Sequence, residues 1–372
     1  MSRVKTLTAI GSTEIVGLVV SSLFWFILAS LVNPENYGNI FYLISIAGVA
    51  SLVSPILTNY VSTTYAAKKT EALTELYTIS FIGTIIGILV VYLLTNRIDV
   101  CFLIFGYVSS NLTMGKMLGE KKIKTYTVTN LFQKCLTPVF GFLFYFLFGF
   151  DSIIYALALT YMLHIIIFVK EIKIQRHSLA RIKPGIRFIS SNYLNNLAGL
   201  FGGQVDKLLI ATLFGHTLLG NYSLVTQIIG VMMIIPNIFF RYILTEDLYQ
   251  IENRRLKIKI VLFAIGISVL GFFILPHTIP DIFPKYLGIS EAIGIMSLSV
   301  LPSTYSRIQT SRYLSQEKGL IILGGSAVYT GALFLGITTL VSFMGIAGLA
   351  ISFVVASFSQ VIAHTILNAK LS

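Results

Sequence analysis

The stretch VDKLLIATLFGHTLLGNYSLV, residues 205–225, decides the fold of this chain. It places two adjacent charges, Asp206 and Lys207, inside a long apolar run that turns at Gly215 and then resumes. In hydrocarbon a charge at mid-depth costs at least about 2.5–3.5 kcal/mol, so such charges face a protein partner or a water-filled cavity. The stretch therefore predicts a membrane helix with one polar face, followed closely by a second membrane helix.

The composition of the whole chain agrees with that prediction. Hydrophobic residues make up 55% of its 372 residues, charged residues only 11%, and the mean hydropathy is +0.84, whereas a soluble domain carries roughly 25% charged residues. The two cysteines, Cys101 and Cys135, lie inside apolar runs without metal-ligand spacing, so we expect no disulfide framework, no metal site and no cofactor. The sequence therefore indicates an integral membrane protein.

Long apolar segments recur along the chain, separated by short polar breaks. A bilayer core of about 30 Å needs on the order of 20 apolar residues per helix. We therefore predict an all-α polytopic membrane protein with about twelve transmembrane helices. The expected spans are 10–32, 37–60, 76–95, 98–115, 125–147, 151–170, 188–214, 220–243, 257–279, 287–307, 319–342 and 346–368.

The distribution of basic residues predicts which loops face the cytoplasm. With the N-terminus inside, 23 of the 27 Lys and Arg residues fall on alternate, inward-facing segments, whereas only Arg97 and Lys285 fall on outer loops. This is the bias of the positive-inside rule. The same bias explains the net charge of +12, so nucleic-acid binding is not needed to account for it. Nucleic-acid binding would need a soluble basic face. We expect a multi-pass protein of the plasma membrane with both termini in the cytoplasm.

An internal repeat divides the chain into halves. Residues 29–49, ASLVNPENYGNIFYLISIAGV, align without a gap to residues 211–231, ATLFGHTLLGNYSLVTQIIGV, 182 positions later. Seven positions are identical, among them the Gly-Asn pairs that begin at Gly38 and Gly220. Because six spans per half is an even number, both copies would insert in the same orientation, related by a pseudo-two-fold axis along the membrane normal.

The repeat predicts two six-helix lobes. We place the N-terminal lobe at 1–170, a basic cytoplasmic linker at 171–187 and the C-terminal lobe at 188–372. Internal repeats are typical of secondary transporters, whose substrate site lies between the repeats. Prolines inside the spans, such as Pro55 and Pro236, would bend their helices and serve a rocking motion, although packing explains prolines in membrane helices equally well.

Polar faces on three predicted helices indicate a wet lumen. In 188–214, the asparagines and the Asp206-Lys207 pair fall within one arc of the helix, and 125–147 and 10–32 carry similar faces. Adjacent helical residues do not face each other, so each charge needs a partner on another helix, and a structural ion pair is the alternative to a substrate contact. The candidate lumen residues are Glu14, Asn130, Gln133, Lys134, Asn192, Asn196, Asp206 and Lys207. Of these, Glu14 is near enough to the inner end to reach water by snorkelling.

Several short motifs resemble one family of membrane proteins. They are the hairpin LASLVNPENYGNIFYLISIAGVASLVS near the N-terminus, the stretch VDKLLIATLFGHTLLGNYSL, and the segments IFPKYLGISEAIGIM and RYLSQEKGL. All are similar to polysaccharide-biosynthesis, or lipid-linked oligosaccharide (Wzx-like), flippases of the multidrug/oligosaccharidyl-lipid/polysaccharide exporter superfamily. The resemblance runs along nearly the whole chain, although this chain is short and its loops are clipped.

The resemblance implies a twelve-helix carrier of the cell envelope. Such a carrier moves a lipid-linked oligosaccharide or related polysaccharide precursor from the cytoplasmic to the outer leaflet by alternating access, and it is not an enzyme. The implied partners are an anionic lipid-linked glycan, membrane lipids and glycan-assembly enzymes around a monomeric protein. Because lysine and arginine recognise phosphate, Lys134 and Lys207 are the candidates for the anionic group. Arg241 and Arg307 are candidates for the cytoplasmic entrance, although both also fit the positive-inside bias.

Two other functions stay open. A cation-coupled drug or metabolite antiporter of the same superfamily would need a buried carboxylate cluster, and the sequence places only Asp206 well within a span. A polytopic glycan polymerase or glycosyltransferase would need catalytic groups on a sizeable loop, and the outer loops offer single carboxylates such as Glu35 and Asp151. We therefore rank the transporter of glycans first, the antiporter second and the enzyme third.

Overall fold

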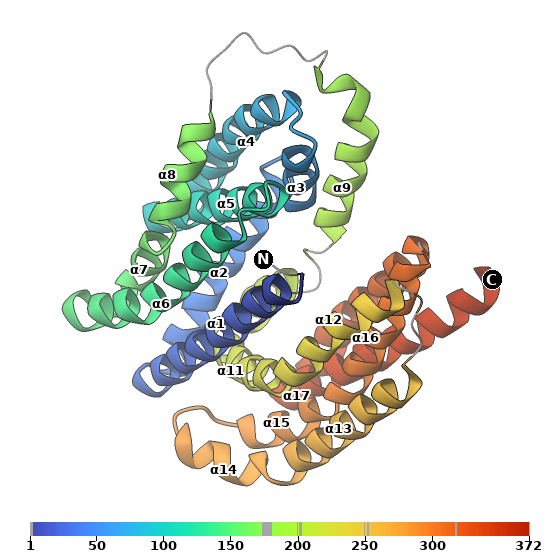
Figure 1. Cartoon of the computed structure of the whole chain (residues 1–372). Helices are drawn as coiled ribbons and strands as arrows, with labels where there is room; N and C mark the ends of the chain where they lie inside the picture. The colour runs from blue at the N-terminus through green and yellow to red at the C-terminus, as the bar shows by residue number, and fades with distance from the viewer. Residues whose placement is uncertain are drawn as a thin grey trace. The chain divides into compact units, whose positions relative to one another are not determined.

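The computed structural model describes residues 3–172, 181–198, 200, 203–248, 250, 253–316 and 318–371, with the side chains of residues 3–14, 195, 198, 241, 245, 248 and 371 outside that description. Within these residues every regular element is a helix, as Figure 1 shows. The chain folds as an all-α polytopic membrane protein, which confirms the predicted fold class.

The helices form two runs along the chain. Up to residue 171 they are α1 (Arg3–Leu31), α2 (Pro34–Val53), α3 (Asn59–Ala67), α4 (Ala72–Thr95), α5 (Ile98–Gly119), α6 (Ile123–Phe148), the short η1 (Phe150–Ser152), α7 (Ile153–Leu159) and α8 (Met162–Glu171). From residue 183 they are η3 (Lys183–Gly185), α9 (Ile186–Ala198), α10 (Val205–Phe214), α11 (His216–Met232), α12 (Ile234–Leu248), α13 (Arg254–Phe273), α14 (Leu275–Ile282), α15 (Ile289–Ser297), α16 (Val300–Ser315) and α17 (Gly319–Leu371).

The predicted spans coincide with these helices, but several spans are interrupted. Each predicted span overlaps one α-helix, one arm of α17, or two consecutive α-helices, and the span 151–170 also includes part of η1. By length and apolar composition, 6 of the described helices can cross a bilayer alone. The number rises to at most 8 when the segment α7–α8, bent by 44°, and the segment α11–α12, bent by 50°, each count as one span. Interrupted membrane helices are tolerated where other protein groups satisfy the freed backbone.

The chain forms two compact contact groups. The first contains Met1–Phe24 and Ile40–Leu208, and the second contains Trp25–Asn39 and Leu209–Ser372. These groups are defined by contacts within each of them, whereas the predicted lobes at 1–170 and 188–372 are defined by the repeat. The lobe boundaries and the linker between them stay a prediction, and residues 173–180 of that linker lie outside the described residues.

The break between α2 and α3 follows from Pro55, whose ring has no N–H to donate. In the gap, the N–H of Leu57 donates to Ser80 Oγ of α4 at 2.9 Å. The hydroxyl of Thr58 caps α3 by accepting from the N–H of Val61 at 3.3 Å. Side-chain hydroxyls thus accept from backbone N–H groups that have no helical partner at the break, and α3 starts as a separate helix.

Two glycines let α3 pack onto α5 with close backbone contact. A Cβ atom on Gly115 would lie 2.6 Å from the carbonyl oxygen of Asn59, and one on Gly119 would collide with the carbonyl oxygen of Thr63. Small residues at this spacing favour helix association in membranes, where apolar burial contributes little. In Figure 1, α3, α4 and α8 gather around α5, and their apolar side chains form the core of the first group.

The repeat glycines meet in the second group, where the start of α2 packs on α11. A Cβ atom on Gly38 would collide with the carbonyl oxygen of His216, and one on Gly220 would collide with the carbonyl oxygen of Pro34. Residues 34 and 216, like 38 and 220, are 182 positions apart. The contact is therefore reciprocal, as in an isologous contact between two copies related by a two-fold axis.

Segments that carry the family resemblance pack around this crossing. Tyr37 is fully buried, and its ring meets that of Tyr286 edge to face with 5.9 Å between centroids. Asn221 donates from Nδ2 to the carbonyl oxygen of Leu287 at 3.0 Å. Lys285 donates to the last carbonyls of α1 at 3.2 Å, where the helix dipole favours a cation. Three stretches far apart in the sequence therefore form one cluster.

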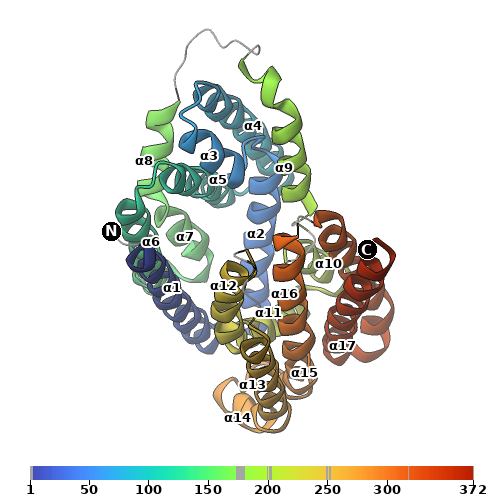
Figure 2. The ribbon, with the colours of Figure 1, turned by 45° about the vertical axis from the view of Figure 1, so that its right-hand side comes forward.

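The element α17 contains two spans. Gly345 interrupts it with φ 54° and ψ −129°, a conformation that glycine adopts without a Cβ penalty. Contacts on either side of the bend pair Gly336 with Ser352 and Gly325 with His364. The arms therefore run antiparallel and match the last two predicted spans. Figure 2 shows α17 near α15 and α16, which it contacts.

Replacing Gly38 or Gly220 by alanine should destabilise the protein, because each new methyl group would meet a backbone carbonyl that cannot move aside. Overpacking of this kind costs typically about 1–3 kcal/mol. We expect a lower unfolding temperature in detergent, followed by the fluorescence of Trp25, the single tryptophan, whose ring lies 6.3 Å from that of Tyr37.

The matched control is Gly230→Ala in α11, since a Cβ atom there meets nothing within 4 Å. This control should unfold at the wild-type temperature or above it, because alanine favours a helix interior more than glycine does. Equal unfolding temperatures for Gly220→Ala and Gly230→Ala would contradict the glycine crossing.

Candidate functional site

The first group contains a polar cavity of about 440 Å³ between α2, α3, α5 and the start of α10. It lies where Pro55 ends the straight run of α2, so the break in that helix opens the space. Its lining residues are Gly48, Ser51, Leu52, Asn59, Tyr107, Ser110, Asn111, Met114, Tyr161 and Gln204. We call this site the polar cavity.

The amides of Asn59 and Asn111 lie on neighbouring helices. Asn59 is the first residue of α3, and its Nδ2 donates to the backbone carbonyl oxygen of Asn111 in α5 at 2.7 Å. This bond fixes the α3 amide against α5, and the close approach of the helices at Gly115 makes it short. The side-chain amide of Asn111 also lines the polar cavity.

Two tyrosines form an aromatic wall. The rings of Tyr107 in α5 and Tyr161, which lies between α7 and α8, meet edge to face with 5.3 Å between centroids. Tyr161 can approach α5 because residue 106 is glycine: a Cβ atom on Gly106 would lie 2.9 Å from the Cβ of Tyr161. The break between α7 and α8 therefore brings an aromatic ring to the cavity.

Gln204, the residue just before α10, enters the cavity from the turn that precedes this helix. Its amide lies against Gly48 of α2, where a Cβ atom would be 2.7 Å from Gln204 Cδ. The Oε1 atom of Gln204 is buried and accepts no hydrogen bond from the described residues. A buried acceptor of this kind normally has a partner, so it is suited to bind a donor that enters the cavity.

The chemistry of the polar cavity is neutral. Its described lining residues carry hydroxyl, amide, aromatic and apolar groups but no charged side chain. Amides and hydroxyls both donate and accept hydrogen bonds, and aromatic rings supply flat apolar surface. The arrangement can bind a polar, uncharged group with several hydroxyls or amides, and its described lining offers no carboxylate to a cation.

Solved structures share this fold. The chain superposes on an inward-facing multidrug resistance MATE family transporter of the MOP superfamily with a TM-score of 0.72 and 11% identity, covering 96% of this chain and 94% of the other. It superposes on the lipid II flippase MurJ, in an inward closed conformation, with a TM-score of 0.70 and 12% identity, covering 98% and 87%. An outward-facing MATE transporter gives a TM-score of 0.60 at 12% identity, covering 99% and 95%. The fold is that of MATE transporters and MurJ.

At the level of sequence no protein-family model matches the chain, and no curated protein sequence matches it. The likeness to solved structures therefore establishes the membrane-embedded, multi-pass transporter fold. A shared fold does not by itself identify the substrate of a protein.

The predicted residues Asn192 and Asn196 of α9 lie outside the lining of the polar cavity. Asn196 donates from Nδ2 to the carbonyl oxygen of Leu52 at 3.3 Å, and the nearby Tyr193 hydroxyl donates to the carbonyl oxygen of Val53 at 2.6 Å. Both carbonyls belong to the last turn of α2, whose oxygens lack helical partners. Asn192 donates to the carbonyl oxygen of Phe188 in its own helix at 2.8 Å. The Asn196 and Tyr193 bonds therefore tie α9 to the broken end of α2.

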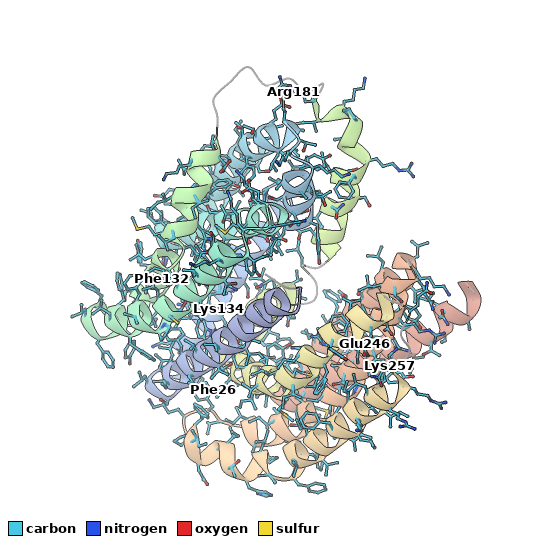
Figure 3. The ribbon with its side chains drawn as sticks, in the orientation of Figure 1. Phe26, Phe132, Lys134, Arg181, Glu246 and Lys257 are labelled. Carbon is cyan, nitrogen blue, oxygen red and sulfur yellow. The ribbon has the colours of Figure 1, made fainter. Side chains whose placement is uncertain are left out.

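The predicted residues of α6 hold helices together. Asn130 is buried, and Gln133 donates from Nε2 to the hydroxyl of Thr160 at 3.2 Å. The side chain of Lys134 lies against Gly17 of α1, where a Cβ atom would be 2.9 Å from Lys134 Nζ. Figure 3 shows Lys134 on α6 beside α1. The predicted polar faces of α1 and α6 are therefore in contact at Gly17 and Lys134.

The two charges of the opening stretch lie in the first turn of α10. Asp206 is buried, with 7% of its surface exposed, at a helix N-terminus that favours a carboxylate. Lys207 is half-buried, and its Nζ donates to the carbonyl oxygen of Gly203 at 2.5 Å. The neighbouring Gln204, rather than either charge, lines the polar cavity.

The remaining candidates lie elsewhere. The side chains of Glu14 and Arg241 lie outside the described residues. The guanidinium of Arg307 in α16 lies over the ring of Phe240 in α12, 5.9 Å from its centroid, and the side chain is exposed. A cation over an aromatic face is stabilising, so this arginine has a packing role besides its predicted place at an entrance.

Filling the notch at Gly48 should close the polar cavity. The background variant has Cys101 and Cys135 replaced by alanine and carries one cysteine in place of Ser110. In this background we expect Gly48→Val to displace the Gln204 amide and to slow the reaction of the cysteine with a small water-soluble thiol reagent. The labelling rate by mass spectrometry is the measurement.

The repeat supplies the control for this variant, because Gly230 lies 182 positions after Gly48 and a Cβ atom there meets nothing within 4 Å. Labelling of Ser110→Cys should be unchanged by Gly230→Val. The same slowing in both backgrounds would mean that Gly48 does not control the cavity.

Proposed function

We propose that this protein is a membrane transporter that flips a lipid-linked oligosaccharide, or a related polysaccharide precursor, from the cytoplasmic to the outer leaflet by alternating access. The observation that carries the proposal is the polar cavity, whose described lining is rich in hydroxyl and amide groups and has no charged side chain. The fold supports it, since the lipid II flippase MurJ and the MATE transporters have the same fold. The sequence motifs that resemble those of polysaccharide-biosynthesis flippases support it as well.

The chemistry of a sugar fits such a lining. A glycan presents many hydroxyl and amide groups on a partly apolar ring, so it binds through hydrogen bonds and aromatic contact rather than through charge. Asn111 and Gln204 supply side-chain amides, and Tyr107 and Tyr161 supply rings. The acceptor atom of Gln204, which accepts no hydrogen bond from the described residues, would take a sugar hydroxyl.

The anionic part of the substrate is assigned to Lys134 and Lys207. Both lie in spans of the first group and are half-buried, and an ammonium group recognises phosphate as a point charge. Lys134 rests its methylene chain in the notch at Gly17, which leaves the charge at the end of a positioned side chain. Their role as substrate contacts is part of the proposal.

Movement between inward- and outward-open states would use the interrupted helices. The breaks at α2–α3 and α11–α12 fall in equivalent helices of the two repeats, near Pro55 and Pro236. Discontinuous helices mark the moving and binding parts of many secondary transporters. The proposed activity is therefore that of a carrier.

A cation-coupled antiporter is the second candidate, favoured by the likeness to multidrug MATE transporters. Coupling to Na⁺ or H⁺ through the polar cavity would need a carboxylate there, and its described lining has none. The fold likeness alone therefore supports this candidate, and we place it second.

The test of the first proposal is lipid flipping in proteoliposomes. The probe is a polyprenyl-pyrophosphate-linked oligosaccharide with a fluorophore, and dithionite quenching reports its movement across the bilayer. The double variant Lys134→Gln and Lys207→Gln should reduce flipping at least about tenfold, since each lost charged hydrogen bond is worth roughly 1.5–3 kcal/mol.

The control is the double variant Lys259→Gln and Lys370→Gln, which removes the same charge from two predicted cytoplasmic segments and should flip the probe normally. Unchanged flipping in the first pair would reject its role. Gradient-driven uptake of a cationic dye, together with no glycan flipping by the wild-type protein, would select the antiporter instead.

The role of the polar cavity has its own test. The variants Asn111→Leu and Gln204→Leu should slow flipping of the oligosaccharide probe but not of the polyprenyl pyrophosphate without sugars, because only the sugars use these amides. Equal slowing of both probes would contradict sugar recognition at this site.

A further inference from the structure

A second cavity lies at the predicted cytoplasmic ends of α3, α4, α5 and α8 in the first group. Its volume is about 670 Å³, and four lysines and two glutamates line it together with Leu73, Tyr77 and small residues. None of its lining residues lines the polar cavity. We call it the basic pocket, and it has no part in the function proposed above.

The two carboxylates of the basic pocket are already neutralised. Glu120 accepts from Lys122 at 2.6 Å and lies 3.6 Å from Lys116. Glu171, at the end of α8, is paired with Lys116. Burial alone would raise the pKa of Glu120, but the hydrogen bond and charge of Lys122 and the charge of Lys116 lower it below its ordinary value. Both glutamates are therefore held as ion pairs.

Two further lysines line the basic pocket. Lys69 and Lys121 are exposed and form no ion pair with the described residues. The pocket therefore carries two positive charges that nothing in its described lining offsets. An uncompensated pair of ammonium groups at the rim of a cavity attracts an anion.

The backbone places these two lysines in matching positions. Lys69 follows α3 with φ 53°, and Lys121 follows α5 with φ 57°. In each case the next residue closes the helix end by a backbone bond, from Thr70 to Tyr65 at 3.1 Å and from Lys122 to Met117 at 2.8 Å. Glycine is the usual residue at this left-handed position, and lysine there is strained. The ends of α3 and α5 thus each place a lysine with a strained, left-handed backbone at the same cavity.

We propose that the basic pocket binds a phosphate-bearing anion through Lys69 and Lys121, at the cytoplasmic face. The volume leaves room for a pyrophosphate or for the phosphodiester headgroup of a lipid with its water. Both share the chemistry that ammonium groups recognise. The inner leaflet supplies anionic headgroups at this depth, and the cytoplasm supplies soluble phosphates.

The test uses the double variant Lys69→Asn and Lys121→Asn in the full chain. Asparagine tolerates the left-handed conformation better than lysine does, so this variant should unfold at the wild-type temperature or above it while losing anion binding. The matched control is Lys68→Asn with Lys124→Asn, since both lysines lie beside the same corners but do not line the pocket.

Two probes separate the sources of phosphate. Pyrophosphate binding to protein in detergent is measured by calorimetry, and phosphatidylglycerol retention by native mass spectrometry after exposure to vesicles of phosphatidylglycerol and phosphatidylcholine. We expect saturable binding of at least one probe, weakened about tenfold or more by the pocket variant, as expected for about 1.4 kcal/mol, and unchanged by the control. Binding of pyrophosphate alone identifies a soluble phosphate, and binding of phosphatidylglycerol alone identifies a lipid headgroup.

Two results would overturn the proposal. One is the absence of saturable wild-type binding for both probes. The other is an equal loss in the pocket variant and in the control, which would show that only the general charge of this face matters. The unfolding temperatures of all variants keep a folding defect apart from a binding defect.

Discussion

Backbone groups in a bilayer must find partners within the protein, and this constraint shapes the interrupted helix at Pro55. Where Pro55 stops α2, the hydroxyl of Ser80 receives the N–H of Leu57, and the side chains of Tyr193 and Asn196 donate to the last carbonyls of α2. Polar groups of α4 and α9 therefore satisfy backbone groups that the break leaves without helical partners. The same break opens the polar cavity, so the constraint and the candidate site have one origin.

Close helix contact in this protein depends on glycine. The α3–α5 contact at Gly115 and Gly119 and the α2–α11 contact at Gly38 and Gly220 each bring one helix against the carbonyl oxygens of another. Between helices surrounded by lipid the hydrophobic effect contributes little, so dispersion forces and shape decide the packing. The space that a glycine leaves on a helix surface also positions side chains, as the space at Gly48 does for Gln204.

Charges are arranged differently at depth and at the ends of the helices. At depth, Lys134 lies along a neighbouring helix at Gly17, and Asp206 and Lys207 lie in the first turn of α10. The polar cavity, which Gln204 lines next to the start of α10, is neutral in its described lining. At the predicted cytoplasmic end, ion pairs neutralise the glutamates of the basic pocket and leave Lys69 and Lys121 unoffset within its described lining. The two proposals therefore concern separate places: the sugars of the transported glycan bind in the polar cavity, and a different phosphate-bearing anion binds in the basic pocket.

Hydropathy and the repeat by themselves determined the membrane class, the positions of the spans and the equivalence of Gly38 with Gly220, because apolar length and spacing are local properties of a chain. They did not determine where the polar side chains of those spans point. Asn196, a candidate for the lumen, also donates to a carbonyl oxygen at the broken end of α2, while Asn59, Tyr107 and Gln204 form a cavity from three separate segments. Only the tertiary structure decides that these side chains come together. Helix breaks and close contacts at glycines set how each helix is rotated and how near it approaches its neighbour, and no local sequence pattern specifies which distant helix faces are in contact.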